Sequence, residues 1–140
     1  MGSKIKLELP SKMDYLGVPD VVLMEIGSDM DCCKRALEEL GASVIEACTN
    51  AMEHGNQLDE ESTVEVILEL EDRVVSVTVL DSGPGFDFET WEPSSELMRE
   101  RGRGILIMRE FTDSLTFGRH PDGRFQVRLT KNLVPPAEDD

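Results

Sequence analysis

Cysteine and long apolar runs are scarce in this sequence, and each scarcity excludes a class of protein. There are three cysteines, Cys32, Cys33 and Cys48. An odd number without zinc-type spacing argues against both a disulfide framework and a zinc site, so we expect reduced thiols packed within helices. The apolar runs, such as residues 21–24, fall far short of the roughly 20 residues of a spanning helix. The N-terminus also lacks the apolar core of a signal peptide. A cytoplasmic protein is expected.

Basic residues are also in short supply. The chain has 14 Lys and Arg against 29 Asp and Glu, a net charge of −15. This balance argues against a duplex nucleic-acid binder and against docking on an anionic membrane, which both need a basic surface. The segment Met98–Lys131 is an exception, with eight basic and four acidic residues. It could hold a small polyanion, while the acidic remainder could steer a basic protein partner.

The length and the hydrophobic pattern predict one domain of two layers. We expect a single domain over residues 1–133 of the 140 and a disordered acidic tail over residues 134–140. Alternating apolar residues predict strands over residues 4–9, 63–70, 75–79, 115–117 and 124–129. Spacings of three and four predict a helix over residues 31–53. Pro19 before an apolar run predicts one over residues 19–26, and the apolar stretch 104–111 predicts a buried helix after a loop over residues 86–101. This order predicts an α+β sandwich: a mixed, mostly antiparallel sheet with helices on one face.

The first segment that carries chemistry lies at the end of the long helix. Glu46, Asn50 and His54 are spaced four residues apart, so they share one polar helix face. The Asn50 carbonyl is a hard oxygen ligand suited to Mg²⁺. Glu46, one turn away, could take a proton from a nucleophile held near that metal. A solvated surface face is the alternative interpretation.

The second segment, residues 81–85, reads Asp-Ser-Gly-Pro-Gly and directly follows an apolar strand. Gly83 and Gly85 allow the backbone to approach a flat ligand closely. The Asp81 carboxylate could accept a hydrogen bond from an exocyclic amine such as that of adenine. A plain turn is the alternative.

The third segment, residues 101–104, reads Arg-Gly-Arg-Gly and precedes an apolar stretch. If it opens a helix, its free N–H groups and the helix dipole would attract a phosphate, and Arg101 and Arg103 would add positive charge. A helix start that needs a flexible backbone is the alternative.

Taken in order, the three segments resemble the ATP-binding motifs of the GHKL superfamily of gyrase, heat-shock chaperone, histidine kinases and MutL. Residues 46–55 resemble its N box, residues 81–85 its G1 box, and residues 102–104 its G2 box. The resemblance extends from about residue 4 to residue 133. The form Glu-x-x-x-Asn-Ala-x-x-His-Gly and the length of a lone domain most resemble the anti-sigma factor serine-protein kinases of bacterial partner-switching systems. The resemblance implies the Bergerat fold, with a small ATP lid between the G1 and G2 boxes.

The resemblance also implies roles for individual residues. Glu46 would be the catalytic base, Asn50 would hold Mg²⁺ across the phosphates of ATP, and Asp81 would bond the adenine amine. Thr130, in the last strand, resembles the family threonine near the adenine pocket. The ATP-binding set is then Asn50, His54, Asp81, Gly83, Gly85, Arg101, Gly102, Arg103, Gly104 and Thr130.

The function so implied is that of an anti-sigma-factor-like regulator that uses ATP and Mg²⁺. It would phosphorylate a serine or threonine of an anti-sigma factor antagonist and bind a sigma factor; a homodimer stays open. Two alternatives remain. One is a non-catalytic switch that grips a sigma factor and uses ATP only to set its shape. The other is a histidine-kinase-type catalytic domain acting on a histidine of another chain.

Overall fold

The structure, a computed structural model, describes residues 2–85 and 96–136, and for residues 96–103 it describes the backbone alone. The strands are β1 (Ser3–Pro10), β2 (Thr63–Glu71), β3 (Val74–Asp81), β4 (Ser114–Arg119) and β5 (Phe125–Asn132). The helices are α1 (Val18–Ser28), α2 (Lys34–Asn50) and α3 (Glu96–Phe111), with short turns η1 (Met13–Tyr15) and η2 (Ala51–Gly55). The predicted order of strands and helices is confirmed.

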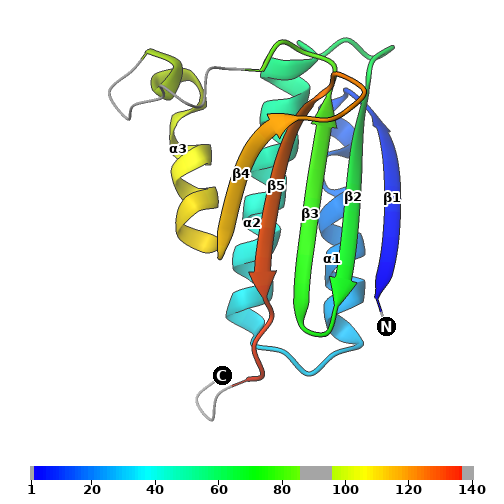
Figure 1. Cartoon of the computed structure of the whole chain (residues 1–140), viewed down its shortest axis with the longest axis vertical. Coiled ribbons are helices and arrows are strands. Elements are labelled where there is room, and N and C mark those ends of the chain that lie inside the picture. The colour runs from blue at the N-terminus through cyan, green and yellow to red at the C-terminus, as the bar shows by residue number, and fades with distance from the viewer. Residues whose placement is uncertain (1, 86–95, 137–140) are drawn as a thin grey trace.

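The strands form one sheet in the order β1-β2-β3-β5-β4, with the helices on one of its faces (Figure 1). All four strand pairs in the described part of the chain are antiparallel. The predicted two-layer α+β sandwich with helices on one face of a mostly antiparallel sheet is confirmed, and only the expectation of some parallel pairing was wrong for the described strands. β5 turns back from β4 through a tight hairpin and inserts between β3 and β4. As a result, β3 and β4, which run in the same direction, are never neighbours.

The core lies between the sheet and helix α2. Leu40, Val44 and Cys48, four residues apart, are completely buried on one side of this helix. Alternate residues of β2, among them Val64 and Val66, are buried in the same core cluster. Each such side chain contributes roughly 1.5–3 kcal/mol. Burial also raises the pKa of the Cys48 thiol to about 12, so the thiol stays protonated. The cysteines are free and pack in or against the core, as expected, but only Cys48 lies in a helix. The expectation of helix packing was wrong for Cys32 and Cys33, which lie between α1 and α2.

Helix α2 does not continue regularly to residue 53, as its periodicity predicted. It ends at Asn50 and widens into the π-helical turn η2. The Asn56 N–H donates to the Ala51 carbonyl, five residues back, at 2.8 Å. Such turns occur mainly at functional sites, where they shift side chains away from the 3.6-residue period.

Helix α3 begins at Glu96, eight residues before the predicted start at residue 104. Residues 96–101, expected in a loop, are helical. Leu, Met, Arg and Glu are all strong helix formers, and they outweigh the cost of two glycines. The rest of the predicted loop, with most of the predicted lid, and residues 137–140 of the predicted tail lie outside the described residues. In the described ranges, no helix has the length and apolar character to cross a membrane.

Candidate functional site

Helices α2 and α3 bring the first and third sequence segments together. Gly104 of α3 faces the polar side of α2: a Cβ placed on Gly104 would lie 2.6 Å from Glu46 Oε2 and 3.6 Å from Asn50 Nδ2. Glu46 and Asn50 are half-buried. Ile105, the next residue of α3, and Met108, one turn further along, are buried in the core and so hold α3 close to α2. The polar helix face is therefore covered by the helix that carries the glycine pair, which argues against a merely solvated surface.

The second segment, residues 81–85, is called here the G1 loop. It starts at Asp81, the last residue of the central strand β3, whose side chain is only 4% exposed. The Gly83 N–H donates to Asp81 Oδ1 at 2.8 Å. A Cβ on Gly55 would lie 2.4 Å from the carboxyl carbon of Asp81. The carboxylate thus sits directly against the end of η2, and the first and second segments meet there.

The two glycines of the G1 loop are required by internal packing. A Cβ on Gly83 would lie 2.1 Å from the backbone oxygen of Gly55. Gly85 has a φ of +69°, and a Cβ there would lie 2.2 Å from the ring of Phe125. The sequence predicted that these glycines leave room for a flat ligand. A Cβ at either position would meet the protein's own backbone or an aromatic ring, which by itself requires glycine there, and the approach of a ligand to this backbone stays a prediction.

Asn56 was missed by the sequence analysis. It is 7% exposed and follows η2. Its Nδ2 donates to Ser11 Oγ at 2.8 Å and to the Thr63 carbonyl at 3.0 Å, and its Oδ1 accepts from the Ser82 N–H at 2.8 Å. One amide therefore joins the segment after β1, the start of β2 and the G1 loop. A lone Asn after a Gly is common in turns, so the sequence offered no signal for this role.

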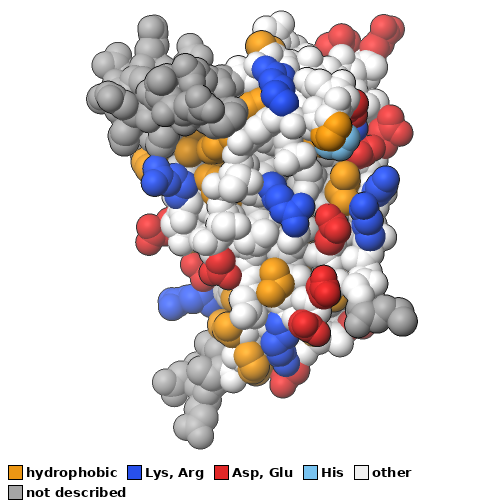
Figure 2. Space-filling model, in the orientation of Figure 1, with side chains coloured by type: hydrophobic (Ala, Val, Ile, Leu, Met, Phe, Trp, Pro, Cys, Tyr) orange, Lys and Arg blue, Asp and Glu red, His pale blue; other side chains and the backbone are white. Residues whose placement is uncertain are grey.

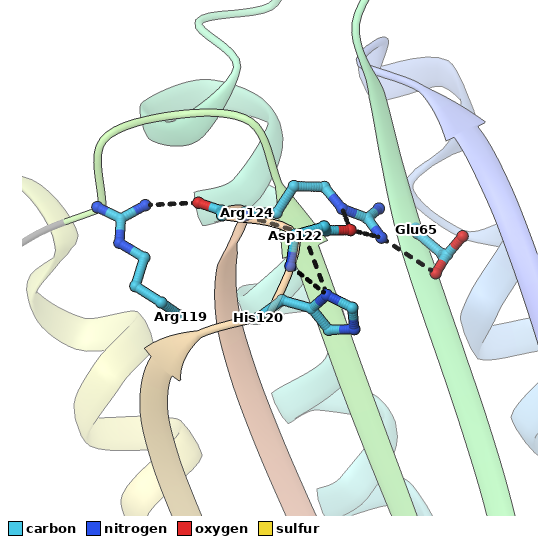
Figure 3. Close-up of polar contacts among 6 residues, drawn as sticks. Glu65, Arg119, His120, Asp122 and Arg124 are labelled. Atoms are coloured by element: carbon cyan, nitrogen blue, oxygen red, sulfur yellow. Dashed lines mark hydrogen bonds and ion pairs between the residues drawn. The ribbon is translucent and has the colours of Figure 1, made fainter.

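The β4–β5 hairpin lies beside the G1 loop and is braced by charged groups (Figure 3). Asp122 accepts hydrogen bonds from the backbone N–H of Arg124 at 3.0 Å and from its Nε at 2.9 Å. These bonds lower the pKa of the Asp122 carboxyl to about 2. Arg124 also pairs with Glu65 of β2 at 3.6 Å. The turn is therefore tied to the sheet.

Comparison with known proteins identifies the family. Residues 9–131 match the family described as the histidine kinase-like ATPase domain. The chain belongs to this family. Membership implies ATP binding, in agreement with the resemblance drawn from the three segments, and the antiparallel sheet with helices on one face is consistent with the Bergerat fold expected of it.

Three named bacterial proteins are similar to this histidine kinase-like ATPase domain over most of its length. It is 31% identical to the serine-protein kinase RsbW of Listeria monocytogenes serovar 1/2a, over 95% of this chain and 89% of the relative. It is 28% identical to RsbW of Bacillus subtilis, over 92% and 85%. It is 31% identical to the anti-sigma F factor of Bacillus velezensis, over 95% and 94%.

Not every predicted site residue lies in the cluster formed by Glu46, Asn50, Asp81 and Gly104 of the ATPase domain. Thr130 pairs with Ser76 in the ladder between β3 and β5, whereas Asp81 pairs with Phe125. The two positions are thus separated by roughly 17 Å along the strand. Thr130 also contacts Ser114 on the sheet face that points away from the helices. The prediction that Thr130 lies near the adenine pocket was therefore wrong.

The remaining predicted residues fall into two groups. His54 is half-buried in η2, next to Gly55, and so lies beside the cluster but on the wider turn. Arg101, Gly102 and Arg103 lie in the part of α3 whose side chains are outside the described residues. Their backbone lies inside α3, not at its start, as does that of Gly104. The interpretation of this segment as the first turn of a helix was wrong.

Two other surfaces lie away from the cluster. A groove of about 620 Å³ lies between α1 and strands β1 and β2, with a mainly apolar lining that includes Ile5, Val21 and Leu68. Among the predicted site residues whose side chains the structure describes, none lines it. On the open face of the sheet, basic and acidic side chains are interspersed (Figure 2), as in the pair of Arg128 and Glu69 at 3.8 Å.

Proposed function

We propose that this protein is an ATP-dependent serine/threonine-protein kinase that phosphorylates an anti-sigma factor antagonist and also binds a sigma factor. The observation that carries the proposal is the placement of Glu46 and Asn50 directly beneath Gly104. Asp81 lies at the end of the neighbouring strand. Relatives named serine-protein kinase and anti-sigma F factor support this type of activity and partner.

In this proposal the residues around α2 hold the nucleotide. Asp81 accepts a hydrogen bond from the adenine amine, and Asn50 supplies an oxygen ligand to Mg²⁺. The donor set fits this metal, because Mg²⁺ keeps several waters and takes only one or two protein ligands beside the phosphates of its nucleotide. Bound Mg²⁺ would neutralise phosphate charge. His54, Gly83, Gly85 and residues 101–104 complete the proposed nucleotide site.

Glu46 is the proposed catalytic base. Its carboxylate accepts the proton of a serine or threonine hydroxyl of the partner as that oxygen takes the γ-phosphoryl group and ADP leaves. Phosphoryl transfer depends mainly on positioning and charge neutralisation, so one base beside one metal ligand suffices. The place of Glu46, one turn from Asn50 on the same helix face, is where such a base is needed.

The decisive experiment replaces the base without changing its size. Glu46→Gln should lower the rate of partner phosphorylation about 10²–10⁴-fold at saturating ATP, because the amide cannot accept a proton. ATP affinity should stay near that of the parent. The assay is a time course with labelled ATP and candidate antagonists. Glu38→Gln, an exposed position on the same helix, is the matched control and should keep full activity.

The outcomes separate the alternatives. Activity of Glu46→Gln above a tenth of the parent would exclude Glu46 as the base. Phosphohistidine as the product would favour a histidine-kinase-type domain acting in trans. If the parent binds a sigma factor but transfers no phosphoryl group, the non-catalytic switch is favoured. The similarity to the anti-sigma F factor supports this alternative.

The nucleotide site has its own test. Asp81→Asn should weaken ATP binding by about 1–3 kcal/mol, because a charged acceptor for the adenine amine is lost while Oδ1 can still accept from Gly83. Calorimetry with ATP measures the effect. Asp72→Asn, an exposed change in the β2–β3 turn, is the control. Equal ATP affinity in parent and Asp81→Asn would remove Asp81 from the site.

A further inference from the structure

Arg119, the last residue of β4, reaches from the hairpin to the G1 loop. Its Nη1 donates to the Gly83 carbonyl at 3.4 Å, and its Nη2 donates to the neighbouring Pro84 carbonyl. Nη1 also donates to the Gly123 carbonyl of the β4–β5 turn at 3.4 Å. Figure 3 shows its guanidinium beside the loop that follows β3, while Arg124 extends the other way towards Glu65. A single side chain therefore joins two consecutive carbonyls of the loop to the hairpin.

The same side chain lies over an aromatic ring next to Asp81. The guanidinium carbon of Arg119 is 5.5 Å from the ring centre of Phe125, within the range of a cation–π contact. Phe125 is 2% exposed and is the ladder partner of Asp81. Its ring also stacks with Phe117 at 6.3 Å and fills the space beside Gly85. Phe125 thus forms a fixed floor under the end of the G1 loop.

The opposite side of the loop is equally confined. Gly83 rests against the backbone of Gly55, and the Ser82 N–H donates to Asn56. The loop that carries Asp81 is held between η2 on one side and Arg119 with Phe125 on the other. The η2 side is buried backbone, whereas the other side combines the buried ring of Phe125 with the exposed side chain of Arg119. Removing the Arg119 side chain takes away the hydrogen bonds to the Gly83 and Pro84 carbonyls and leaves Phe125 and the η2 side in place.

We propose that Arg119 is a positioning residue that holds the G1 loop, through its two carbonyls, in the conformation that presents Asp81 to the nucleotide base. This inference rests on the proposed nucleotide site and deepens it to base specificity. A carboxylate attracts the exocyclic amine of adenine but repels the carbonyl that guanine carries at the same ring position. A fixed Asp81 therefore discriminates ATP from GTP, and a mobile one does so less. The planar fork of Arg can reach two adjacent carbonyls, which a single ammonium group does poorly.

The test combines loop motion with base discrimination. Arg119→Met keeps the apolar stem and removes the fork, and Arg119→Lys keeps the charge alone. Arg128→Met is the matched control, because Arg128 is an exposed arginine of β5 that pairs with Glu69 on the open sheet face. Hydrogen exchange of the amides of residues 82 and 83 is measured without nucleotide. The affinities for ATP and GTP are measured by calorimetry.

We expect Arg119→Met to speed exchange of these amides about tenfold and to weaken ATP binding about tenfold, the scale of one or two lost hydrogen bonds. GTP binding should not change, Arg119→Lys should lie between, and Arg128→Met should match the parent. Unchanged exchange in Arg119→Met overturns the inference, and so does an equal loss of ATP and GTP affinity, which a purely structural role would produce. A parent that binds no ATP overturns the proposed function instead, while the exchange result still decides whether Arg119 holds the loop.

Discussion

The G1 loop and helix α3 both bring glycines to the candidate site, but they do so for different reasons. Gly83 is enclosed by backbone, since its missing side chain leaves just enough room for the carbonyl of Gly55. The described atoms nearest to a Cβ on Gly104 belong to the ends of two side chains, those of Glu46 and Asn50. A backbone carbonyl held by η2 cannot move aside, whereas a glutamate side chain can. The first glycine is therefore a requirement of the fold, and the second leaves room for chemistry at α2.

The difference extends to the neighbours of each segment. The G1 loop is tied by Asn56 to the segment after β1 and to the start of β2, and by Arg119 to the hairpin. Among the described side chains of α3, Ile105 and Met108 are buried in the apolar core cluster that includes Val44 and Cys48 of α2. Directional polar contacts fix one wall of the site to a definite geometry. Apolar contacts hold α3 in place but constrain its rotation and its register along α2 less.

The largest effect is expected from removing the amide that ties the G1 loop. Asn56→Ala should lower the free energy of unfolding by roughly 3 kcal/mol, because the Ser82 N–H, the Ser11 hydroxyl and the Thr63 carbonyl all lose the buried amide as their partner. Unfolding in urea measures this. The exposed Asn132→Ala should change little. A loss of stability below about 1 kcal/mol for Asn56→Ala would contradict the conclusion that hydrogen bonds of Asn56 fix the G1 loop.

A matched pair of glycine substitutions tests the comparison directly. Gly83→Ala should destabilise the protein by about 2 kcal/mol, because its Cβ meets the Gly55 backbone. Gly104→Ala should stabilise it by up to about 1 kcal/mol, because alanine favours a helix interior and Glu46 can move away. Thermal and urea unfolding of both variants give the two signs. Equal effects on stability would contradict the distinction between the two glycines.

Under the proposed function, Gly104→Ala carries a second expectation. The added methyl group displaces the carboxylate of Glu46, so phosphotransfer should fall although the fold becomes more stable. Activity that rises together with stability would show that Gly104 does not limit the position of Glu46.

The smallest effect is expected at the hairpin, through Asp122. Its pKa lies at about 2, below its ordinary value of 3.8, so its carboxylate stabilises the fold above about pH 4, and this contribution is lost as the pH falls towards 2. Arg124→Met should return the Asp122 pKa towards 3.8 and reduce this acid dependence. An NMR titration of the Asp122 carboxyl measures the midpoint, with Arg128→Met as the control. An unchanged midpoint would mean that Arg124 does not cause the shift.

Local sequence patterns determined the order of elements and the two layers of this protein. The alternation in β2 and the four-residue spacing of Leu40, Val44 and Cys48 are periodic, and periodicity states which face is buried. The same patterns placed Glu46 and Asn50 on one face and Asp81 at the end of a strand. The family could be recognised from the order of these short segments, because their residue types and spacings are properties of the chain alone.

Tertiary structure alone decided how the elements fit together. β5 inserts between β3 and β4, so the strand pairs of the described ranges are all antiparallel, and Thr130 lies away from Asp81. α3 extends back to Glu96 and places Gly104 against Glu46. Asn56 acts through partners that lie between 7 and 45 residues away in the sequence. Arg119 contacts carbonyls of the G1 loop that lie 35 or 36 residues away. No local pattern encodes such contacts, because a polar or aromatic residue acquires its role only from the groups that folding brings beside it.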